Sequence, residues 1–448
     1  MKLLLTHGYF LYEDPKEQAI MKPYAPLGIL YLSSHLRARG FDVEVYDSTF
    51  GSKYDLISLL DTQTPAAIGI YGNLMTRPNV LEIITHARAS GWKVVLGGPE
   101  PPNYAEEYLN AGADVIVSGE GELALERLLK FGFRAEQFAS IPGLIFQATD
   151  GTVVRTAADT TIKNLDEQPW PDRERIDIES YLRVWRTHHG KGSVSVITAR
   201  GCPYHCNWCS HSVYGKTHRR RSPKPVVDEI EWILTRYNPE MLWIADDVFT
   251  IHHGWLYEYA AEMKRRQLQI PFECITRADR INDRVANTLA ELGCFRVWIG
   301  SESGSQRILD AMQRDVTVDQ VSRAIDLCKA NGIQTGMFLM WGYDGEEIED
   351  IEATVDHVRR CRPDIFFTTV SYPIKGTPYF ERVKTRLVNI AEWKQSTDRD
   401  YRIQGRHSRR FYHYADELLR SEAADQPDIQ KILTAREGLR QTWHEVEA

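Results

Sequence analysis

The sequence predicts an α/β protein with an N-terminal doubly wound parallel sheet, a partial barrel of six strand–helix units and a C-terminal helical region. Short apolar runs alternate with amphipathic helical patterns over residues 1–131, and the same alternation resumes near Ser193. Residues 132–190, between the two series, show no sustained hydrophobic period. Strands that alternate with helices are typical of parallel sheets whose faces are covered by helices.

Five strand–helix units are expected in the first series. The expected strands are Lys2–Leu5, Asp42–Tyr46, Ala66–Ile70, Lys93–Leu96 and Asp114–Val117. Helical patterns such as Leu27–Arg39 and Pro78–Ser90 separate them. Ligands bind such sheets at the carboxyl ends of the strands. The loops at those ends are rich in glycine and polar residues, so we expect a ligand-binding face there.

The rest of the chain divides into three regions. Residues 132–190 are expected to be a connector with a small hairpin around Gly143–Val154. Residues 191–385 carry the second series, and six units are fewer than the eight of a closed barrel. The expected strands of this series are Ser193–Thr198, Met241–Ala245, Pro271–Thr276, Arg296–Ile299, Gln334–Met340 and Ile365–Val370. Residues 386–448 are expected to be a helical extension.

The composition limits the classes of partner. The formal net charge of −8 offers no excess of basic residues for binding phosphates, so we expect no nucleic-acid partner. No apolar run approaches the ~20 residues that a membrane span needs, and the first residues resemble a strand rather than a signal peptide. We therefore expect a cytoplasmic protein without a membrane span.

Three of the seven cysteines, Cys202, Cys206 and Cys209, stand within eight residues in a C-x3-C-x2-C spacing. Iron–sulfur clusters are held by thiolates, and three ligands on a 4Fe–4S cluster leave one iron open for chemistry. The amino and carboxylate groups of S-adenosylmethionine can fill that position. The alternatives are a zinc site completed by His205 or His211, or three buried core thiols.

The segment Arg200–Cys209, with Trp208 directly before the last cysteine, resembles the C-x3-C-x-Φ-C signature of the radical SAM superfamily. Residues 1–385 resemble the subgroup with an N-terminal cobalamin-binding-like domain, which includes hopanoid methylases, the anaerobic porphyrin cyclase and peptide or antibiotic methylases. The resemblance implies a Rossmann-like first domain, a TIM-like partial (β/α)6 barrel, and a place for Trp208 beside the adenine of S-adenosylmethionine.

Two expected strands of the second series end in charged residues. Asp246 and Asp247 stand where the superfamily often has a Gly-Gly-Glu that contacts the methionine ammonium, so they are candidates for that contact or for a helix N-cap. Arg277 is suited to bidentate binding of the methionine carboxylate or a substrate anion. Its alternative is a salt bridge to Asp279 or Glu302.

Glycines and polar residues follow the next two strands. The resemblance implies that the loop containing Gly300, Glu302 and Ser303 lies against the ribose and methionine of S-adenosylmethionine, with Glu302 as a hydrogen-bond acceptor. The alternative for the serines is helix capping. Gly342 would allow the backbone to approach adenosine closely.

The first domain lacks the D-x-H-x-x-G motif that normally supplies a cobalt-binding histidine, because its first loop reads Leu5-Thr6-His7-Gly8. The resembling subgroup holds cobalamin without a protein imidazole. The expected cobalamin contacts are Gly72, Asn73, Gly97, Gly98 and Pro99. The alternative is a vestigial domain that binds no corrinoid.

These features predict an enzyme that cleaves S-adenosylmethionine reductively to a 5′-deoxyadenosyl radical and uses cobalamin to methylate an unactivated carbon of a small organic or lipid-like substrate. The alternatives are radical cyclisation, oxidation or rearrangement, and a non-catalytic iron–sulfur sensor or scaffold. The expected partners are a small-molecule substrate and a low-potential electron donor such as flavodoxin or ferredoxin. The sequence identifies no catalytic residue. Phe366, Phe367, Tyr372, Tyr379 and Phe380 weakly favour an apolar or aromatic substrate.

Overall fold

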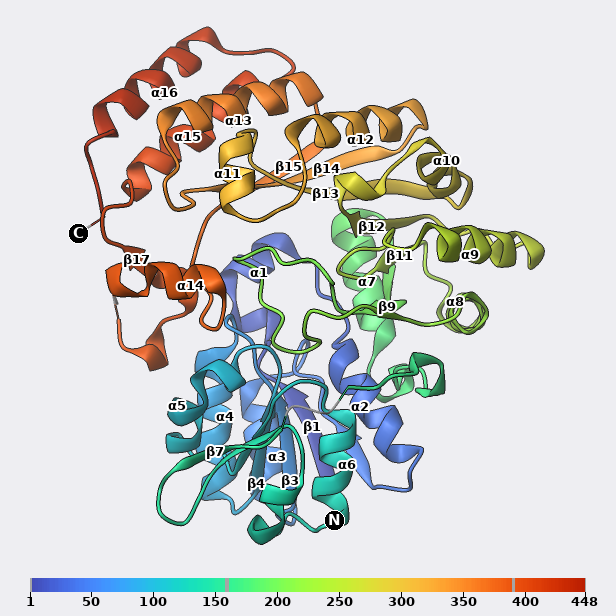
Figure 1. Ribbon diagram of the computed structural model, residues 1–448. Helices are drawn as coiled ribbons and strands as arrows, with labels where there is room; N and C mark the ends of the chain where they lie inside the picture. The colour runs from blue at the N-terminus through green and yellow to red at the C-terminus, as the bar shows by residue number, and fades with distance from the viewer. Residues whose placement is uncertain (1, 158–160, 389–390, 448) are drawn as a thin grey trace. The chain divides into compact units, whose positions relative to one another are not determined.

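The computed structural model describes residues 2–157, 161–388 and 391–447 (Figure 1). The chain divides into two compact units. The first comprises Met1–Cys202, His211–Leu242 and Trp393–Thr397, and the second comprises Pro203–Ser210, Trp243–Glu392 and Asp398–Ala448.

A seven-stranded sheet with the order β2-β1-β3-β4-β5-β6-β7 forms the centre of the first unit. Its strands are β1 (Leu3–His7), β2 (Val43–Val45), β3 (Ala67–Tyr71), β4 (Lys93–Gly97), β5 (Val115–Val117), β6 (Leu144–Gln147) and β7 (Val153–Arg155). The first five are parallel, as expected. The hairpin expected around Gly143–Val154 exists as β6 and β7, and it extends the sheet because β6 pairs antiparallel with β5. This pairing covers the backbone groups that an edge strand would leave exposed.

Alternate residues of the parallel strands enter two different cores. Leu4 packs in one core with residues of α3 and α4, whereas Leu3 and Leu5 pack in the other with residues of α2 and α6. This division follows from the two-residue period of a strand, and it makes the sheet doubly wound. The helices of this unit are α1 (Pro15–Ile20), α2 (Leu27–Arg37), α3 (Lys53–Thr62), α4 (Arg77–Ala89), α5 (Ala105–Asn110), α6 (Glu122–Lys130), α7 (Ile178–His189) and α8 (Pro223–Tyr237).

The second series forms a six-stranded sheet with the order β15-β14-β13-β12-β11-β8, which confirms the predicted open barrel-like arrangement. Its strands are β8 (Ser193–Val196), β11 (Met241–Ile244), β12 (Phe272–Thr276), β13 (Cys294–Glu302), β14 (Gln334–Trp341) and β15 (Ile365–Val370). The pairs β12–β13, β13–β14 and β14–β15 are parallel. The helices of the second unit that precede the C-terminal extension are α9 (His253–Arg265), α10 (Asp283–Glu291), α11 (Gln306–Ala311), α12 (Val318–Ala330), α13 (Ile348–Cys361) and α14 (Pro378–Val383).

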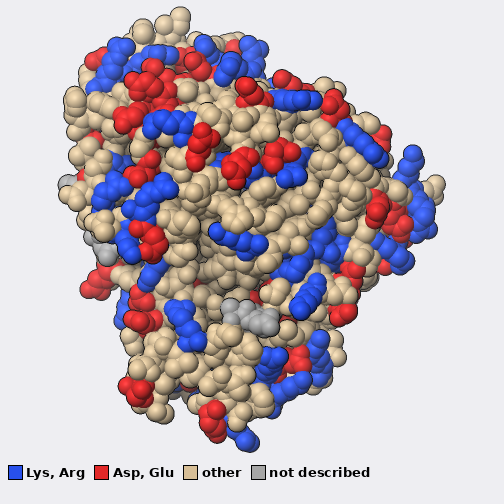
Figure 2. Space-filling view, in the orientation of Figure 1, with Lys and Arg blue, Asp and Glu red and all other residues tan. Residues whose placement is uncertain are grey.

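The C-terminal extension is helical, as expected. Helices α15 (Arg409–Glu422) and α16 (Ile429–Thr442) pack against each other, and α15 also packs against α13 (Figure 1). Short antiparallel pairs complete the structure, formed by β9 (Ala199–Arg200) with β10 (Arg219–Arg220) and by β16 (Leu387–Val388) with β17 (Arg402–Ile403). Lys and Arg are interspersed with Asp and Glu on the face shown in Figure 2. In the part of the chain that the structure describes, no helix is long and apolar enough to cross a membrane.

Candidate functional site

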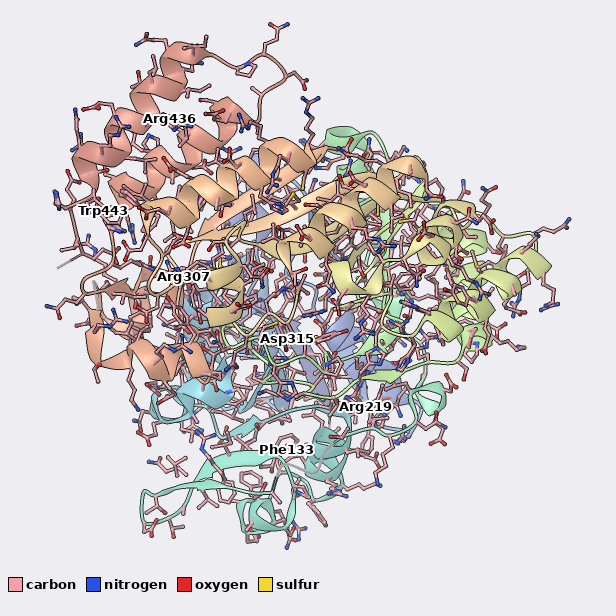
Figure 3. The ribbon with its side chains drawn as sticks, turned by 45° about the horizontal axis from the view of Figure 1, so that its top comes forward. Phe133, Arg219, Arg307, Asp315, Arg436 and Trp443 are labelled. Carbon is pink, nitrogen blue, oxygen red and sulfur yellow. The ribbon has the colours of Figure 1, made fainter. Side chains whose placement is uncertain are left out.

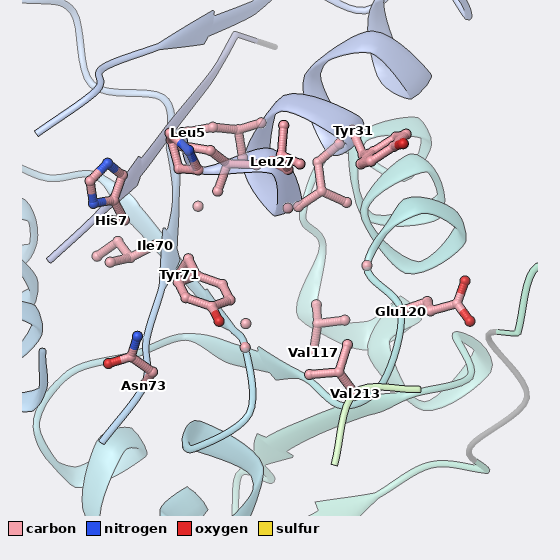
Figure 4. Close-up of a pocket in the computed structure, with 18 of the residues that line it drawn as sticks. Leu5, His7, Leu27, Tyr31, Ile70, Tyr71, Asn73, Val117, Glu120 and Val213 are labelled. Carbon is pink, nitrogen blue, oxygen red and sulfur yellow. The ribbon is translucent and has the colours of Figure 1, made fainter. Parts of the chain in front are cut away.

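A cavity of about 520 Å³ lies at the carboxyl ends of the first sheet (Figure 4). Residues from β1, β3, β4 and β5, or from the loops after them, form its wall, together with Leu27 and Tyr31 of α2. Its position agrees with the rule that parallel α/β sheets bind ligands at this edge. The cavity lies wholly within the first unit.

Part of this wall is formed by the backbone of glycine residues, which contribute no side chain. Gly98 has φ +104°, and a Cβ at this position would lie 2.3 Å from the carbonyl oxygen of Gly72. Only glycine fits this position without a shift in the backbone. Asn73, Gly97 and Gly98 line the cavity as the sequence analysis expects.

The other two expected contacts, Gly72 and Pro99, do not line the cavity. The Gly72 N–H donates to the carbonyl of Gly97 at 2.8 Å, and the Pro99 carbonyl accepts from the Ser212 hydroxyl at the same distance. Both residues therefore shape the loops rather than the wall.

His7 lines the cavity, but both of its ring nitrogens are engaged within the protein. The Tyr9 N–H donates to Nδ1 at 3.2 Å, so the ring proton lies on Nε2, which donates to the Asp47 carboxylate at 2.9 Å. Burial opposes ionisation of Asp47, yet hydrogen bonds from His7, Tyr181 and the Thr49 N–H lower its pKa. A metal therefore finds no free nitrogen lone pair on His7.

Buried ion pairs hold another part of the wall. Glu120 and Glu122 follow β5, and the Arg200 guanidinium lies 2.9 Å from the Glu120 carboxylate and 2.7 Å from that of Glu122. Arg219 also pairs with Glu120, at 2.5 Å. Because the charges are matched, the cavity presents paired rather than isolated carboxylates.

Tyr71 is a cavity residue that the sequence analysis did not single out. It ends β3, and its ring points into the cavity in Figure 4. Burial raises the pKa of its phenol, so it remains protonated and able to donate a hydrogen bond at neutral pH. A tyrosine in an apolar run is usually interpreted as a core residue, so nothing in the sequence indicates that Tyr71 lines a cavity.

In the second unit, Asn207 anchors the cysteine-containing loop. Its backbone N–H donates to the carbonyl of Met312 at 3.1 Å, and its side-chain N–H donates to the carbonyl of Ala311 at 2.8 Å. Its side-chain oxygen accepts from the Tyr343 hydroxyl at 2.5 Å. Trp208 packs beside it on an apolar cluster that includes Met312 and Tyr343. These contacts fix the loop around its second cysteine.

Two arginines approach the buried sulfur of Cys206. The nearest guanidinium nitrogens of Arg277 and Arg314 lie 3.8 Å and 3.7 Å from Sγ. Arg277 also donates to Asp279 at 2.8 Å and lies over the ring of Tyr204, 3.6 Å from its centroid. The salt-bridge alternative for Arg277 is therefore present in the structure. Positive charge at this sulfur suits a thiolate ligand, so these residues fit an iron–sulfur cluster.

The three cysteines of the motif differ in their exposure. Cys202 is half-buried, Cys206 is buried and Cys209 is exposed. Within residues 2–157, 161–388 and 391–447, no group of three or more His, Cys, Asp or Glu side chains stands close enough to hold a metal ion. Ligation of a cluster by the three cysteines therefore stays a prediction from their spacing.

Glu302 ends β13 in a backbone conformation that favours glycine, with φ +60°. Burial raises the pKa of its carboxyl, and Arg314 and Arg277 partly offset this effect. Its nearest charge partner is Arg314, at 3.9 Å. A strained, weakly paired carboxyl at a strand end is typical of a ligand contact, because the surrounding structure must stabilise the strain.

The remaining residues that the sequence analysis expects at the site differ in burial and in their hydrogen bonds within the protein. Asp246 is buried and Asp247 is exposed beside it. The Gly300 carbonyl accepts from Arg314 at 2.9 Å, and the Ser303 hydroxyl lies 3.2 Å from that of Thr354 on α13. Gly300 and Ser303 thus use polar groups to build the loop, whereas Asp247 remains open to solvent.

Gly342, after β14, has φ +69°, and a Cβ there would lie 2.8 Å from the ring of Tyr412 on α15. Its N–H donates to Glu346 at 2.6 Å and its carbonyl accepts from Ser371 at 2.6 Å. The loop therefore supports the C-terminal extension. Whether Gly342 also contacts adenosine stays a prediction.

Next to Gly342, a second cavity of about 360 Å³ is lined by Glu346, His407, Tyr412 and Trp443. Trp443, directly after α16, is labelled in Figure 3. Glu346 is buried, and its Oε1 has no hydrogen-bond partner within the described residues. Burial raises its pKa to about 8.

Comparisons with known proteins match two separate regions of the chain. Residues 20–129 match the model of the B12 binding domain, and residues 196–358 match the model of the radical SAM superfamily. An uncharacterized methyltransferase of Pyrococcus horikoshii is 27% identical over 416 residues, which cover 89% of this chain and 87% of that protein. An anaerobic magnesium-protoporphyrin IX monomethyl ester cyclase of Rubrivivax gelatinosus is 29% identical over 355 residues, or 76% of this chain and 63% of the cyclase.

Two solved structures have a similar fold. The radical S-adenosylmethionine methyltransferase TsrM from Kitasatospora setae aligns with a TM-score of 0.73 and 21% identity, covering 87% of this chain and 79% of TsrM. The cobalamin-dependent S-adenosylmethionine radical enzyme OxsB aligns with a TM-score of 0.75 and 18% identity, covering 98% of this chain and 71% of OxsB. At these identities the likeness establishes the fold, and it covers both predicted series of strand–helix units.

Proposed function

We propose that this chain, in which one region matches the B12 binding domain and another the radical SAM superfamily, is a radical SAM enzyme that methylates an unactivated carbon of a small organic substrate with the help of cobalamin. The observation that carries this proposal is the cavity at the carboxyl ends of the first sheet, whose wall includes glycine backbone and a histidine with no free lone pair. Such a cavity suits a corrinoid whose cobalt is not bound by a histidine of the protein.

In this proposal, residues 1–131 hold the corrinoid and residues 191–385 hold the cluster and S-adenosylmethionine. A bound 4Fe–4S cluster would supply the electron for reductive cleavage of S-adenosylmethionine, and bound cobalamin would supply methyl-transfer chemistry. Cys202, Cys206 and Cys209 would bind three of the four irons. A low-potential donor such as flavodoxin or ferredoxin would deliver the electron.

The chain's own residues have definable tasks. Arg277 and Arg314 offset the negative charge of a thiolate at Cys206. Trp208 offers a flat apolar surface beside the cysteine loop, which suits the adenine ring. Among the candidate residues, Glu302 is weakly paired and Asp247 is exposed, so both carboxyl groups suit the ammonium or the ribose hydroxyls of S-adenosylmethionine.

The test uses protein purified anaerobically from corrinoid-supplied cells. We expect about four irons and about one corrinoid per chain, and 5′-deoxyadenosine after reduction in the presence of S-adenosylmethionine. Incubation with methyl-deuterated S-adenosylmethionine and a small-molecule extract should also yield a labelled product and S-adenosylhomocysteine. The matched control replaces all three cluster cysteines with alanine.

Three outcomes separate the alternatives. Deoxyadenosine and a new unlabelled product would favour cyclisation, oxidation or rearrangement, the reaction class of which the cyclase relative is an example. Zinc without iron would contradict the cluster assignment. Iron without deoxyadenosine or any product would favour a sensor or scaffold.

A further inference from the structure

Three aromatic residues, one each from β13, β14 and β15, pack together in the second unit. The ring centroids of Trp298 and Phe338 are 5.2 Å apart, and those of Trp298 and Phe367 are 5.3 Å apart. The interplanar angles are 16° and 12°, so the three rings are nearly parallel. We name these three residues the aromatic platform.

The platform lies on the face of the sheet opposite the helices. On the helix-covered face, the Ser301 hydroxyl lies 3.3 Å from His357 of α13, and the Arg420 guanidinium of α15 lies over Phe366. Because successive side chains of a strand alternate between faces, Trp298 and Phe367 point to the other face.

Phe338 belongs to the same face because it pairs in register with Gly300 and with Phe367. Gly300 is on the face that carries the candidate ligand contacts, since a Cβ on it would meet the Glu302 carboxylate at 2.8 Å and the Arg314 guanidinium at 2.6 Å. The platform therefore lies on the same side of the sheet as these two polar groups.

The geometry of the platform is held in place by the sheet. Trp298 lies flat over Gly336, where a Cβ would come within 2.2 Å of the indole ring. The indole N–H donates to the Glu273 carboxylate at 3.0 Å, and Arg296 binds the same carboxylate oxygen at 3.3 Å. These contacts fix the indole plane before any ligand arrives.

One ring of the platform remains open. Phe367 is 51% exposed, whereas Trp298 is 6% exposed. An exposed phenylalanine is ordinary on its own. Here its ring is nearly parallel to those of Trp298 and Phe338, and its centroid lies 5.3 Å and 6.4 Å from theirs. A flat ring on the exposed side of Phe367 would therefore stack in the same orientation, and offset stacking strengthens such a contact beyond its buried area.

We propose that the aromatic platform binds a planar, conjugated ring of the substrate, so that this enzyme acts on an aromatic or conjugated macrocyclic compound rather than a saturated lipid. The inference rests on the proposed function, because it takes the ligand of the aromatic platform to be the substrate that receives the methyl group, beside the S-adenosylmethionine proposed at Glu302. It narrows the substrate class from small organic or lipid-like compounds to flat ring systems.

The test compares two probes of the same outline, naphthalene-2-carboxylate and its saturated analogue decahydronaphthalene-2-carboxylate, by equilibrium dialysis with the cluster- and corrinoid-loaded protein. We expect the planar probe to bind about fivefold more tightly, which is the size of one or two stacking contacts. Phe367→Leu keeps an apolar side chain at an exposed position and should abolish the preference. Phe366→Leu alters the neighbouring ring on the helix-covered face and should leave the preference unchanged.

Equal affinity for the two probes, no binding of the planar probe, or a preference that survives Phe367→Leu would overturn the proposal. The binding measurement needs no radical chemistry, so its result does not depend on methyl transfer. A protein that shows the preference but transfers no methyl group would contradict the proposed function and leave the platform in place.

Discussion

The strand ends of the two sheets are built on different principles. At the first sheet, glycine loops and tightly paired side chains leave a cavity of about 520 Å³. At the second sheet, charged side chains fill the space beside the cysteine loop, where Arg277 and Arg314 both lie within 3.8 Å of the Cys206 sulfur.

The difference indicates two ways to accommodate a cofactor. A large corrinoid requires volume, so the chain supplies glycine where a Cβ would clash and engages polar groups such as His7 with internal partners. A charged cluster requires compensating charge, so the chain brings guanidinium groups to the sulfur. The predictions below test this contrast from the largest expected effect to the smallest.

Replacement of Cys206 with alanine should have the largest effect. Removal of one thiolate next to two guanidinium groups should reduce bound iron from about four atoms per chain to nearly none, because the cluster has no fourth cysteine nearby. Iron and sulfide analysis after anaerobic reconstitution measures this. Cys328→Ala, at a buried single thiol on α12, is the control and should retain full iron.

Replacement of Gly98 with alanine should remove the corrinoid. The added methyl group would meet the Gly72 carbonyl at 2.3 Å in a backbone conformation that disfavours alanine, so the loop must shift. We expect corrinoid content to fall at least about fivefold while iron content is unchanged. Gly254→Ala, which has no atom within 4 Å of the added Cβ, should keep both cofactors. Loss of both cofactors in Gly98→Ala would indicate a folding defect instead.

Glu346→Gln should stabilise the protein at high pH. Burial raises the pKa of Glu346 to about 8, so the unfolded chain releases this proton near pH 4.5 while the folded protein retains it. The contribution of this group to stability therefore falls as pH rises from about 4.5 to 8, by up to about 1.4 kcal/mol per pH unit. The thermal midpoint of the variant should exceed that of the wild type at pH 8 and match it near pH 4. Equal midpoints at pH 8 would contradict the raised pKa.

Glu302→Ala should weaken S-adenosylmethionine binding about tenfold without loss of iron, because its carboxyl is proposed to contact only the nucleotide or the methionine. Glu302→Gly should show the same loss of affinity and be about 1 kcal/mol more stable than the alanine variant, because glycine accepts φ +60°. Equal loss of iron in both variants would assign Glu302 to folding.

His7→Ala should have the smallest effect on the cofactor. Since both nitrogens of His7 are already engaged, the variant should bind corrinoid with an unchanged base-off spectrum. A shifted spectrum would identify His7 as a cobalt ligand. Tyr71→Phe is the matched comparison for His7→Ala. It alters another residue of the same cavity, keeping the ring and removing the hydroxyl.

Local patterns determined much of the architecture. The two-residue and 3.6-residue hydrophobic periods were enough to predict the five parallel strands of the first sheet and the six strands of the second, because these periods follow from backbone geometry. The C-x3-C-x2-C spacing, with Trp208 before its last cysteine, was enough to predict the chemistry, because ligand spacing in a short loop is a local property.

Other features were decided only by the tertiary structure. The sequence placed Gly72 and Pro99 among the cofactor contacts, but their backbone groups are used between loops and they do not line the cavity. Arg314 gave no local signal, because its contact with Cys206 joins residues 108 positions apart. The face of the sheet on which Trp298, Phe338 and Phe367 lie depends on strand register. Which ring nitrogen of His7 carries the proton depends on its hydrogen bond with Asp47, 40 residues away. Periodicity and spacing are properties of neighbouring residues, whereas cavity walls, charge pairs and shared faces arise only when distant segments pack together.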